Sequence, residues 1–495
     1  MMMSSETVLQ LAVIIPLLSV VALMITSRMP NIRETVSLIT GLVLFTLVLT
    51  LYQRMMQGET VQVHWFDIIP DLGFNFHIEP LGVLFALIAS FLWIITTIYA
   101  IGYMRKNGES NQTRFYSCFA IAIGAVMGIA FAADLFTLFI FYEVLTLSTY
   151  PLVTHSGNEA AKKGGRVYLG ILLTTSIVFL LFAIIATWFV AGTLDFIPGG
   201  VFEGQTSHLV LSVLLVMFVF GVGKAAIMPF HRWLPSAMVA PTPVSALLHA
   251  VAVVKAGVFS IMKICLFIFG LDLLPLLSST QFLLYLAGFT VLMASLIAMR
   301  QDSLKARLAY STISQLSYII IGALLATASG VLGGSMHIAM HAFGKITLFF
   351  CAGAIYVSLR KTHISDMQGI GWQMPVTMTA FFIASLSIIG VPPAGGTWSK
   401  WFLVMGSLEA GQWFLIVALM ISSLLNIAYL LPIPFRAFFP KDQQAMQRAG
   451  LKEAPLPALI AIVLTTLFCL ILFVYPQPLY ELAEAVLNTA EASHG

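Results

Sequence analysis

The sequence predicts an all-α membrane protein that crosses the bilayer about fourteen times. Three observations predict this fold class: the composition, the spacing of apolar windows and the placement of basic residues. The chain has 495 residues, of which 59% are hydrophobic and only 9% are charged. Soluble domains carry about 25% charged residues, so a chain this poor in charge has too little polar surface to be a soluble globular protein.

Apolar windows of about 20 residues, the length that a helix needs to cross a bilayer, follow one another along the whole chain. We expect fourteen spans, at residues 7–27, 32–53, 79–102, 113–131, 134–153, 164–191, 209–240, 244–269, 280–299, 303–326, 331–357, 374–410, 413–435 and 455–476. No soluble domain is expected between them. A secretory signal is not expected either, because Met1 to Glu6 carry no positive charge and the first apolar run is long.

The basic residues predict the topology. If alternate connections are taken together, seventeen lysines and arginines fall on one side of the membrane and Arg54 stands alone on the other. The seventeen are Arg28, Arg33, Arg105, Lys106, Arg114, Lys162, Lys163, Arg166, Arg300, Lys305, Arg307, Arg360, Lys361, Arg436, Lys441, Arg448 and Lys452. Basic connections stay in the cytoplasm, so both termini are expected outside. One missed or invented span would scramble this bias, which therefore also supports the helix count.

The four cysteines fall inside expected spans and share no spacing. They are Cys118, Cys265, Cys351 and Cys469. This pattern is typical of small buried residues and not of a disulfide framework or a metal site. We expect no cofactor.

Six basic residues remain inside the spans: Lys224, Arg232, Lys255, Lys263, Lys345 and Lys400. A lysine at the centre of a membrane helix costs about 2.5–3.5 kcal/mol on insertion scales. The four most central lysines (224, 255, 345 and 400) together cost on the order of 10 kcal/mol, as much as the net stability of a domain. Such a cost indicates a functional role. A single acid, Glu143, lies at an equivalent depth, as the tenth residue of a twenty-residue span.

Three other polar residues near the span ends have simpler interpretations. Lys263 lies about one and a half turns from the outer end of its helix, and Arg232 lies similarly near the inner side, so both side chains can snorkel to the interface. His231, beside Pro229, is either a relay residue or an interfacial cap.

The central residues are harder to explain in this way. Glu143 would form a fixed structural ion pair with Lys224 if it had no functional role. Local unwinding after the sequence PPAGG would let water solvate Lys400. Lys255 and Lys345 are too central to snorkel, which favours a functional role for both.

Two spans contain helix breakers near their middle. The span 209–240 is too long for one straight crossing, and we expect its helix to break at Pro229. The span 374–410 carries two prolines and two glycines at 392–396. Broken backbone at membrane depth survives only inside protein or beside a water-filled cavity. A lysine lies near each break, which indicates a transport pathway.

The two broken spans are the seventh and the twelfth, five apart. An odd offset places two five-helix units in opposite orientations, the inverted repeat that is typical of ion transporters. We therefore divide the chain into N-terminal helices 1–3 (1–112), a first five-helix repeat of helices 4–8 (113–270), an inverted second repeat of helices 9–13 (271–438), and helix 14 with a tail (439–495).

Histidines extend the line of central lysines. His337, His341 and Lys345 follow an i, i+4, i+8 pattern and share one face of the eleventh helix. Imidazole titrates near neutrality and both accepts and donates protons, so this stripe is typical of a proton wire. The alternative is haem ligation by histidines of facing helices, for which only His249 is a comparably buried partner. His249 lies six residues before Lys255 and does not share its helix face.

Four runs of the sequence carry a family resemblance: WLPSAMVAPTPVSALLHAVAVVKAGVFSIMK, FYEVLTLSTYPLV, HAFGKITLFF and IIGVPPAGGTWSKWFL. The chain resembles the proton-translocating antiporter-like membrane proteins, strongest from about Phe115 to Leu403. That superfamily includes three subunits of respiratory complex I and the A and D subunits of Mrp-type sodium/proton antiporters. The lysine in HAVAVVKAGVF, the SKW after the PP break and the lack of a C-terminal extension look most like the D subunit.

The resemblance implies roles for the central residues. Glu143 matches the glutamate of the family's fifth helix, and Lys224 matches the seventh-helix lysine with which it pairs. The remaining lysines match a central series that ends in the second half-channel. The expected relay then consists of Glu143, Lys224, Lys255, Lys345, Lys400, His249, His337 and His341. The family's glycine-phenylalanine after the PP break reads Gly396-Thr397 here, which leaves the charge chemistry unchanged.

The expected function is proton translocation within a cation (sodium)/proton antiporter complex of the bacterial inner membrane. Its partners would be the A-, B-, C-, E-, F- and G-type subunits, with no nucleic acid. The chain shows no phosphate-binding loop, metal cluster or nucleophile constellation, so an ion gradient or partner subunits must drive transport. The metal and sodium sites stay unplaced, because the only central carboxylate is committed to Lys224.

Two alternatives stay open. The first is a proton-pumping subunit of a redox-driven complex, either complex I or a membrane-bound hydrogenase. The second is a stand-alone transporter of an organic solute, which broken helices suit but a line of lysines does not. Neighbouring genes for small Mrp-type subunits, or for redox subunits, would discriminate between the antiporter and the redox-driven complex.

Overall fold

The computed structural model describes residues 3–69, 72–440 and 450–492, except for the side chains of Ile69 and His249. Its helices are α1 (Ser5–Ile25), α2 (Pro30–Met56), α3 (Pro80–Asn107), α4 (Gln112–Ala130), α5 (Leu135–Val153), α6 (Glu159–Thr175), α7 (Phe182–Ala191), α8 (His208–Gly221), α9 (Trp233–Ser236), α10 (Thr242–Ala246), α11 (Val253–Ile264), α12 (Ser278–Arg300), α13 (Leu304–Leu324), α14 (Ala328–Leu359), α15 (Pro375–Ile389), α16 (Gly396–Glu409), α17 (Trp413–Leu430), α18 (Pro432–Phe438), α20 (Leu456–Val474) and α21 (Gln477–Glu491). Two strands, β1 (Gln62–Ile69) and β2 (Leu72–His77), form an antiparallel hairpin.

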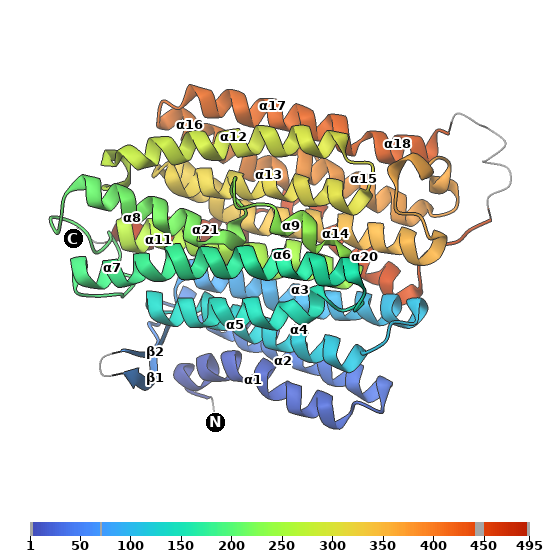
Figure 1. The fold of residues 1–495 in the computed structure, drawn as a ribbon, viewed down its shortest axis with the longest axis horizontal. Coiled ribbons are helices and arrows are strands. Elements are labelled where there is room, and N and C mark those ends of the chain that lie inside the picture. Colours follow the sequence, from blue (N-terminus) through green and yellow to red (C-terminus); the bar gives the residue numbers. More distant parts are fainter. Residues whose placement is uncertain (1–2, 70–71, 441–449, 493–495) are drawn as a thin grey trace.

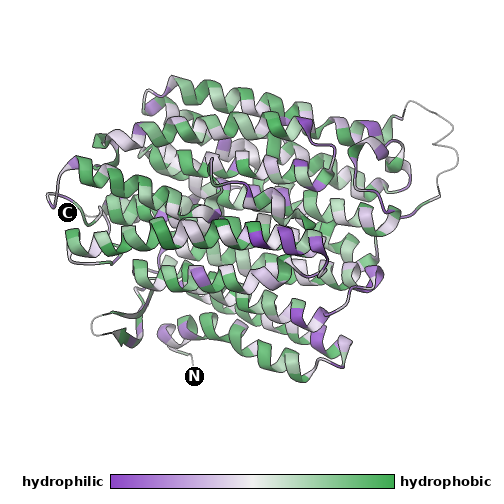
Figure 2. Cartoon of the chain, in the orientation of Figure 1, coloured by the Kyte–Doolittle hydropathy of each residue, from purple (hydrophilic) through white to green (hydrophobic). Residues whose placement is uncertain are grey.

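The helices lie side by side along one common direction (Figure 1). The β-hairpin lies at one end of this bundle, where α1 begins and α21 ends. Hydrophobic residues follow the lengths of the helices, and hydrophilic residues gather at their ends and in the connections (Figure 2). This distribution is the one expected of a bundle surrounded by lipid.

The predicted fold class is confirmed. Within the described residues, ten helices are long and apolar enough to cross a membrane. The four other expected spans are also helical, but none contains a helix that is both long enough and apolar enough to cross a membrane, and each has a physical reason for this. The spans 209–240 and 374–410 are broken, 244–269 winds through two π-helical segments, and α13 carries many polar side chains.

Side-chain caps fix several helix starts. The carboxylate of Asp134 accepts a hydrogen bond from the Thr137 amide at 2.6 Å at the start of α5. Asn158 caps α6 through the Ala161 amide at 2.8 Å. These caps satisfy amides that the first helical turn leaves without a partner.

Two elements were not foreseen. The β-hairpin falls in a region that the apolar windows leave as a connection. Residues 477–491 were expected to be a tail, but they form α21, which packs on α3 and α14. Its buried side chains include Leu482, Val486 and Leu487, while Glu481 and Glu484 on its other face are exposed. A window that seeks continuous hydrophobicity misses such an amphipathic helix.

The end of the bundle opposite the hairpin carries the basic connections, and we name it the basic end. Lys441 and Arg448 lie outside the described residues. Lys305, expected in a connection, lies instead in the first turn of α13, where its ammonium group donates a hydrogen bond to the carbonyl of Ala240. Which end faces the cytoplasm, and the division of the chain into four segments, stay predictions.

Candidate functional site

The first broken helix presents Lys224 from an irregular segment. Helix α8 ends at Gly221, a single 3₁₀ turn spans Gly223–Ala225, and α-helix resumes only at Trp233. We expected the break at Pro229, but the helix ends eight residues earlier, at Gly221. Ala226 adopts a left-handed conformation with φ 55°, and the Trp233 indole donates to the carbonyl of Gly223 at 2.9 Å. The irregular segment is thus held by contacts that its own backbone makes.

Helix α11 packs directly on this segment because Gly257 has no side chain. A Cβ at Gly257 would lie 2.3 Å from the Ala225 nitrogen and 2.4 Å from the Lys224 carbonyl carbon. Neither backbone atom can move away without unwinding the turn. Gly257 therefore fixes how closely the helix that carries Lys255 approaches the backbone of Lys224.

Lys224 is fully buried and lies against α5. Its ammonium group donates to the Tyr142 carbonyl at 2.8 Å and to the Thr146 hydroxyl at 2.5 Å. The same nitrogen lies 3.0 Å from the centroid of the Tyr142 ring. A cation over an aromatic face, with two oxygen acceptors, keeps a buried ammonium group solvated by protein.

The expected Glu143–Lys224 ion pair is not formed. Both carboxylate oxygens of Glu143 are buried and accept no hydrogen bond from any described residue. The reason lies in helix geometry: Tyr142 and Thr146 share a face of α5, and Glu143 lies about 100° around it. Glu143 is still close enough to interact electrostatically with Lys224. The interpretation of a fixed structural ion pair is therefore wrong for this conformation.

Lys255 joins the two predicted repeats. Its side-chain nitrogen lies 2.7 Å from Nδ1 of His341, and both residues are fully buried. Lys255 belongs to α11 and His341 to α14, 86 residues further along the chain. No contact of this kind links Lys224 to Lys255 among the described residues; their helices meet at Gly257.

The stripe on α14 is formed as expected. The rings of His337 and His341 stack with centroids 5.9 Å apart. His337 also contacts the Ser399 hydroxyl through Nδ1 at 2.8 Å and the Gln315 side-chain oxygen through Nε2 at 3.1 Å. An imidazole with a hydrogen-bonding group at each nitrogen can take up a proton on one side and release one on the other.

Lys345 points into a polar cluster between α13, α14 and α17. Its ammonium group donates to the Ser311 hydroxyl at 2.5 Å and contacts the Leu308 carbonyl at 3.5 Å. The Tyr429 hydroxyl lies 2.8 Å from that of Ser311 and also bonds the side chain of Asn426. Lys345 is therefore solvated by hydroxyl and carbonyl oxygens.

The second broken helix presents Lys400 in a similar way. Helix α15 ends at Ile389, Gly390 has a φ of 83°, and α16 starts at Gly396. Lys400 donates to the Ile389 carbonyl at 3.0 Å and to Ser423 at 3.2 Å, 4.7 Å from the centroid of the Tyr318 ring. A cation at the C-terminal end of a helix is favoured by the helix dipole. Protein groups thus contribute to the solvation of Lys400.

The contacts define a candidate relay with an order. They run from Lys255 to His341, on to His337 and its partner Ser399, with Lys400 next in sequence, while Lys345 lies on the other side of His341. Because α14 runs from the hairpin end to the basic end, His337 lies toward the hairpin end and Lys345 toward the basic end. Among the described residues, no carboxylate forms an ion pair with Lys255, Lys345 or Lys400. The side chain of His249 lies outside the described residues.

Sequence reasoning missed the polar partners of the relay. Ser311, Gln315 and Tyr318 all face it from α13. Their spacing of i, i+4 and i+7 places them on one helix face, and this polar stripe inside an apolar span was the signal that would have found them.

Lys263 is not a snorkelling side chain. It is 1% exposed and forms an ion pair with Glu79 at 2.6 Å, and it also donates to the Ala132 carbonyl at 2.6 Å. Glu79 precedes the first residue of α3, so a distant helix start supplies the counter-charge. By contrast, Arg232 is exposed, as a snorkelling residue would be, and His231 is half-buried with its ring 6.4 Å from that of Tyr310.

No group of three or more His, Cys, Asp or Glu side chains that could hold a metal ion occurs in the part of the chain that the structure describes.

The fold and the site together define a polytopic membrane protein with a buried line of titratable amines and imidazoles. Residues 132–426, more than half of the chain, match the family "NADH:quinone oxidoreductase/Mrp antiporter, TM", and residues 65–116 match "NADH-Ubiquinone oxidoreductase (complex I), chain 5 N-terminus". The chain belongs to the NADH:quinone oxidoreductase/Mrp antiporter family.

Relatives on both branches of the family are similar to this chain. NADH-quinone oxidoreductase subunit N of Desulforudis audaxviator is 32% identical over 90% of this chain and 89% of its own. The A-type Na(+)/H(+) antiporter protein of Alkalihalophilus pseudofirmus is 29% identical over 91% of this chain, but this chain spans only 59% of that longer relative. A chain in the structure of the Mrp complex from Dietzia sp. DQ12-45-1b has the same fold, with a TM-score of 0.87, 22% identity, and coverage of 99% of this chain and 98% of that chain.

Proposed function

We propose that this chain is the D-type, proton-translocating subunit of a multisubunit sodium/proton antiporter in the bacterial inner membrane. Family membership supports an antiporter-like role. Among the described residues, the carrying observation is a series of contacts that crosses from one predicted repeat to the other: Lys255 lies within hydrogen-bonding distance of His341, the His341 ring stacks on that of His337, and His337 contacts the Ser399 hydroxyl. Amines and imidazoles in hydrogen-bonding contact are groups that exchange protons.

Glu143 and Lys224 act as the switch at one end of this relay. With Lys224 on Tyr142 and Thr146, the carboxylate stands apart, as in the present conformation. Rotation of the lysine toward Glu143 gives a paired state that stabilises its charged form, and return to Tyr142 releases the proton toward Lys255. Protons then move between the repeats through the Lys255–His341 contact. The basic end faces the cytoplasm in this proposal.

The remaining subunits supply what this chain lacks. We propose A-, B-, C-, E-, F- and G-type partners, one of which provides the sodium site. Exposed apolar residues along α12 and α17, such as Phe289 and Met420, suit packing against lipid or a neighbouring subunit. Purified alone and placed in proteoliposomes, the chain should show no antiport, and exchange at the rate of the whole complex would contradict this proposal.

The decisive experiment expresses the chain with its neighbouring genes in cells without other sodium/proton antiporters. Everted vesicles are first acidified inside, and added sodium should then release the pH gradient, as followed by a fluorescent amine. A vector without this gene serves as the control. No sodium-dependent release, with the complex assembled on native gels, would overturn the proposal.

The subunit N relative favours a second candidate, a proton-pumping subunit of a redox-driven complex. This match covers nearly the whole of both chains. In the same vesicles, an electron donor would then build a pH gradient through this chain, whereas sodium alone would have no effect. The two functions therefore give opposite results in one preparation.

A further inference from the structure

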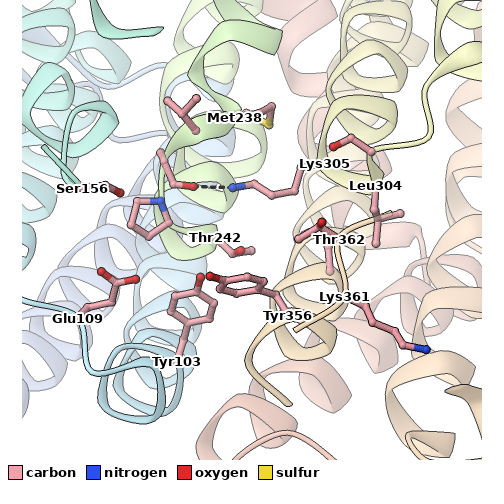
Figure 3. A pocket seen from close by; sticks show the side chains of 15 residues that line it. Tyr103, Glu109, Ser156, Met238, Thr242, Leu304, Lys305, Tyr356, Lys361 and Thr362 are labelled. Carbon is pink, nitrogen blue, oxygen red and sulfur yellow. Dashed lines mark hydrogen bonds between the residues drawn. The ribbon is translucent and has the colours of Figure 1, made fainter. Parts of the chain in front are cut away.

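A polar cavity of about 270 Å³ lies at the basic end, apart from the relay (Figure 3). Its wall comes from both predicted repeats. Tyr103, Ala240 and Thr242 belong to the first half of the chain, and Lys305 and Tyr356 belong to the second. The connections that carry Glu109, Ser156, Ser303 and Thr362 surround it. A cavity among these connections is placed to exchange water and protons with the solvent at the basic end.

Lys305 is the basic side chain that turns into this cavity. Figure 3 shows its side chain pointing across the cavity to the Ala240 carbonyl, to which it donates a hydrogen bond. The other basic residue of the wall, Lys361, extends away, with its ammonium group 2.6 Å from the Asp366 carbonyl. Lys305 also lies in the first turn of α13, where the helix dipole disfavours a cation. A lysine at a position where the helix dipole destabilises its charge indicates that this lysine has a functional role.

Lys345 reaches from α14 to α13 and contacts it about one turn beyond Lys305. The ammonium group of Lys345 contacts the Leu308 carbonyl at 3.5 Å and the Ser311 hydroxyl at 2.5 Å. Lys305, Leu308 and Ser311 are three residues apart in turn, so they form a row that winds around the surface of the helix. Leu308 lies only about 4.5 Å beyond Lys305 along the helix axis. On α14, Ala352 of the cavity wall lies about 10 Å from Lys345, two turns along.

Lys305 is the basic side chain of the cavity that is suited to carry a proton, because the titratable groups around it have other interactions. Glu109 interacts with it electrostatically, and Tyr103 is hydrogen-bonded to Thr242. His155 lies 3.9 Å from Glu109, but burial lowers the pKa of its imidazole, which favours the neutral ring.

We propose that this cavity is the proton port of the basic end and that Lys305 hands protons between its water and Lys345. A hydrated proton passes to the neutral amine of Lys305 and leaves a water molecule behind. The new N–H bond then breaks as the proton moves through intervening water to the neutral amine of Lys345. Charge moves along the row and none is created. This inference rests on the proposed relay function, because Lys345 must receive the proton.

The test uses the assembled complex in everted vesicles, whose outer surface is the basic end in the proposed orientation. Lys305→Arg keeps the charge and the hydrogen bond to Ala240 but cannot release a proton. It should lower the antiport rate about a hundredfold, as should Lys305→Ala. A wild-type rate in Lys305→Arg, or in an assembled Lys305→Ala complex, would overturn the port.

A second measurement is independent of transport. After Cys118→Ser removes the one partly exposed native thiol, Ser303→Cys should react with a membrane-impermeant thiol reagent, and the bound reagent should block antiport. The control, Ser27→Cys, is exposed at the same end outside the cavity and should react without inhibition. No reaction at Ser303→Cys overturns the port by itself. If the unmodified complex shows no antiport but this labelling occurs, the proposed function fails while the cavity stays accessible.

Discussion

The side-chain nitrogen of Lys255 lies 2.7 Å from Nδ1 of His341, at a point where the two halves of the chain meet. Lys255 forms no ion pair with a carboxylate among the described residues, and the His341 imidazole is the polar group that it contacts. A lysine and a histidine in such contact readily share one proton. They bind a second proton weakly, because the two cations would then repel each other. The pair is therefore suited to passing a proton and unsuited to a fixed structural role.

Arginine should not replace the relay lysines. Lys255→Arg and Lys345→Arg keep the charge and most of the aliphatic stem, but arginine stays protonated at every working pH. Both variants should be as inactive in antiport as the alanine variants, with the complex still assembled on native gels. Antiport is measured against pH for all four. Substantial activity of the arginine variants would show that these lysines shape the field and do not carry the proton.

Glu143→Gln should abolish antiport or depress it severely, while expression and assembly stay normal. The carboxylate accepts no hydrogen bond from a described residue in this conformation, so the amide removes a charge without breaking a contact. Sodium-dependent release of a pH gradient in everted vesicles measures the effect. Glu481→Gln, an exposed acid on α21, is the matched control and should keep the wild-type rate. Near-normal exchange in Glu143→Gln would remove Glu143 from the switch.

Gly257→Ala should destabilise the first broken helix. The added Cβ would meet backbone atoms of Lys224 and Ala225, which cannot move aside as a flexible side chain would. The expected cost is about 1–3 kcal/mol, typical of overpacking. The melting temperature of the purified complex measures it. Gly170→Ala on α6 meets nothing within 4 Å and should be neutral, so an equal loss in both variants would contradict the close approach of α11.

The Lys263–Glu79 pair should behave as a buried ion pair. Glu79→Gln leaves the Lys263 charge without its partner and should cost about 3–5 kcal/mol in stability. Replacing both residues, as Glu79→Gln with Lys263→Met, removes the uncompensated charge and should recover most of that loss. Thermal unfolding of the purified complex compares the three proteins. A double variant as unstable as the single one would mean that the pair is not the source of the effect.

Much of the fold followed from local sequence, because the cost of exposing polar groups to lipid makes the spans readable one by one. The relay residues on α14 were readable for the same reason, since 337, 341 and 345 repeat at helical spacing. The amphipathic α21 and the hairpin were missed because neither is a continuous apolar run. Lys263 was misread because its partner, Glu79, lies far away in the chain, and no local pattern reports such a contact.

The Glu143–Lys224 contact shows a different limit. Both residues were correctly placed at the same depth, yet whether their side chains pair depends on rotation about α5 and on the irregular turn at 223–225. In a regular helix, sequence spacing predicts the face on which a side chain lies. In a broken helix it does not predict where a side chain points. The break itself was expected at Pro229 but begins eight residues earlier, which is farther than the single turn that a proline disturbs.

The stripe on α14 runs along its helix, and this direction has an electrical consequence. In the proposed relay, a proton that moves from His337 to Lys345 advances eight residues, about 12 Å, which is roughly two fifths of a 30 Å hydrocarbon layer. Moving one charge across the full layer at 100 mV involves about 2.3 kcal/mol, so this stretch involves about 0.9 kcal/mol. The step from Lys255 to His341 joins neighbouring helices and crosses almost none of the voltage. The membrane potential therefore acts on protons that travel along α14 and leaves the exchange between the two halves of the chain almost untouched.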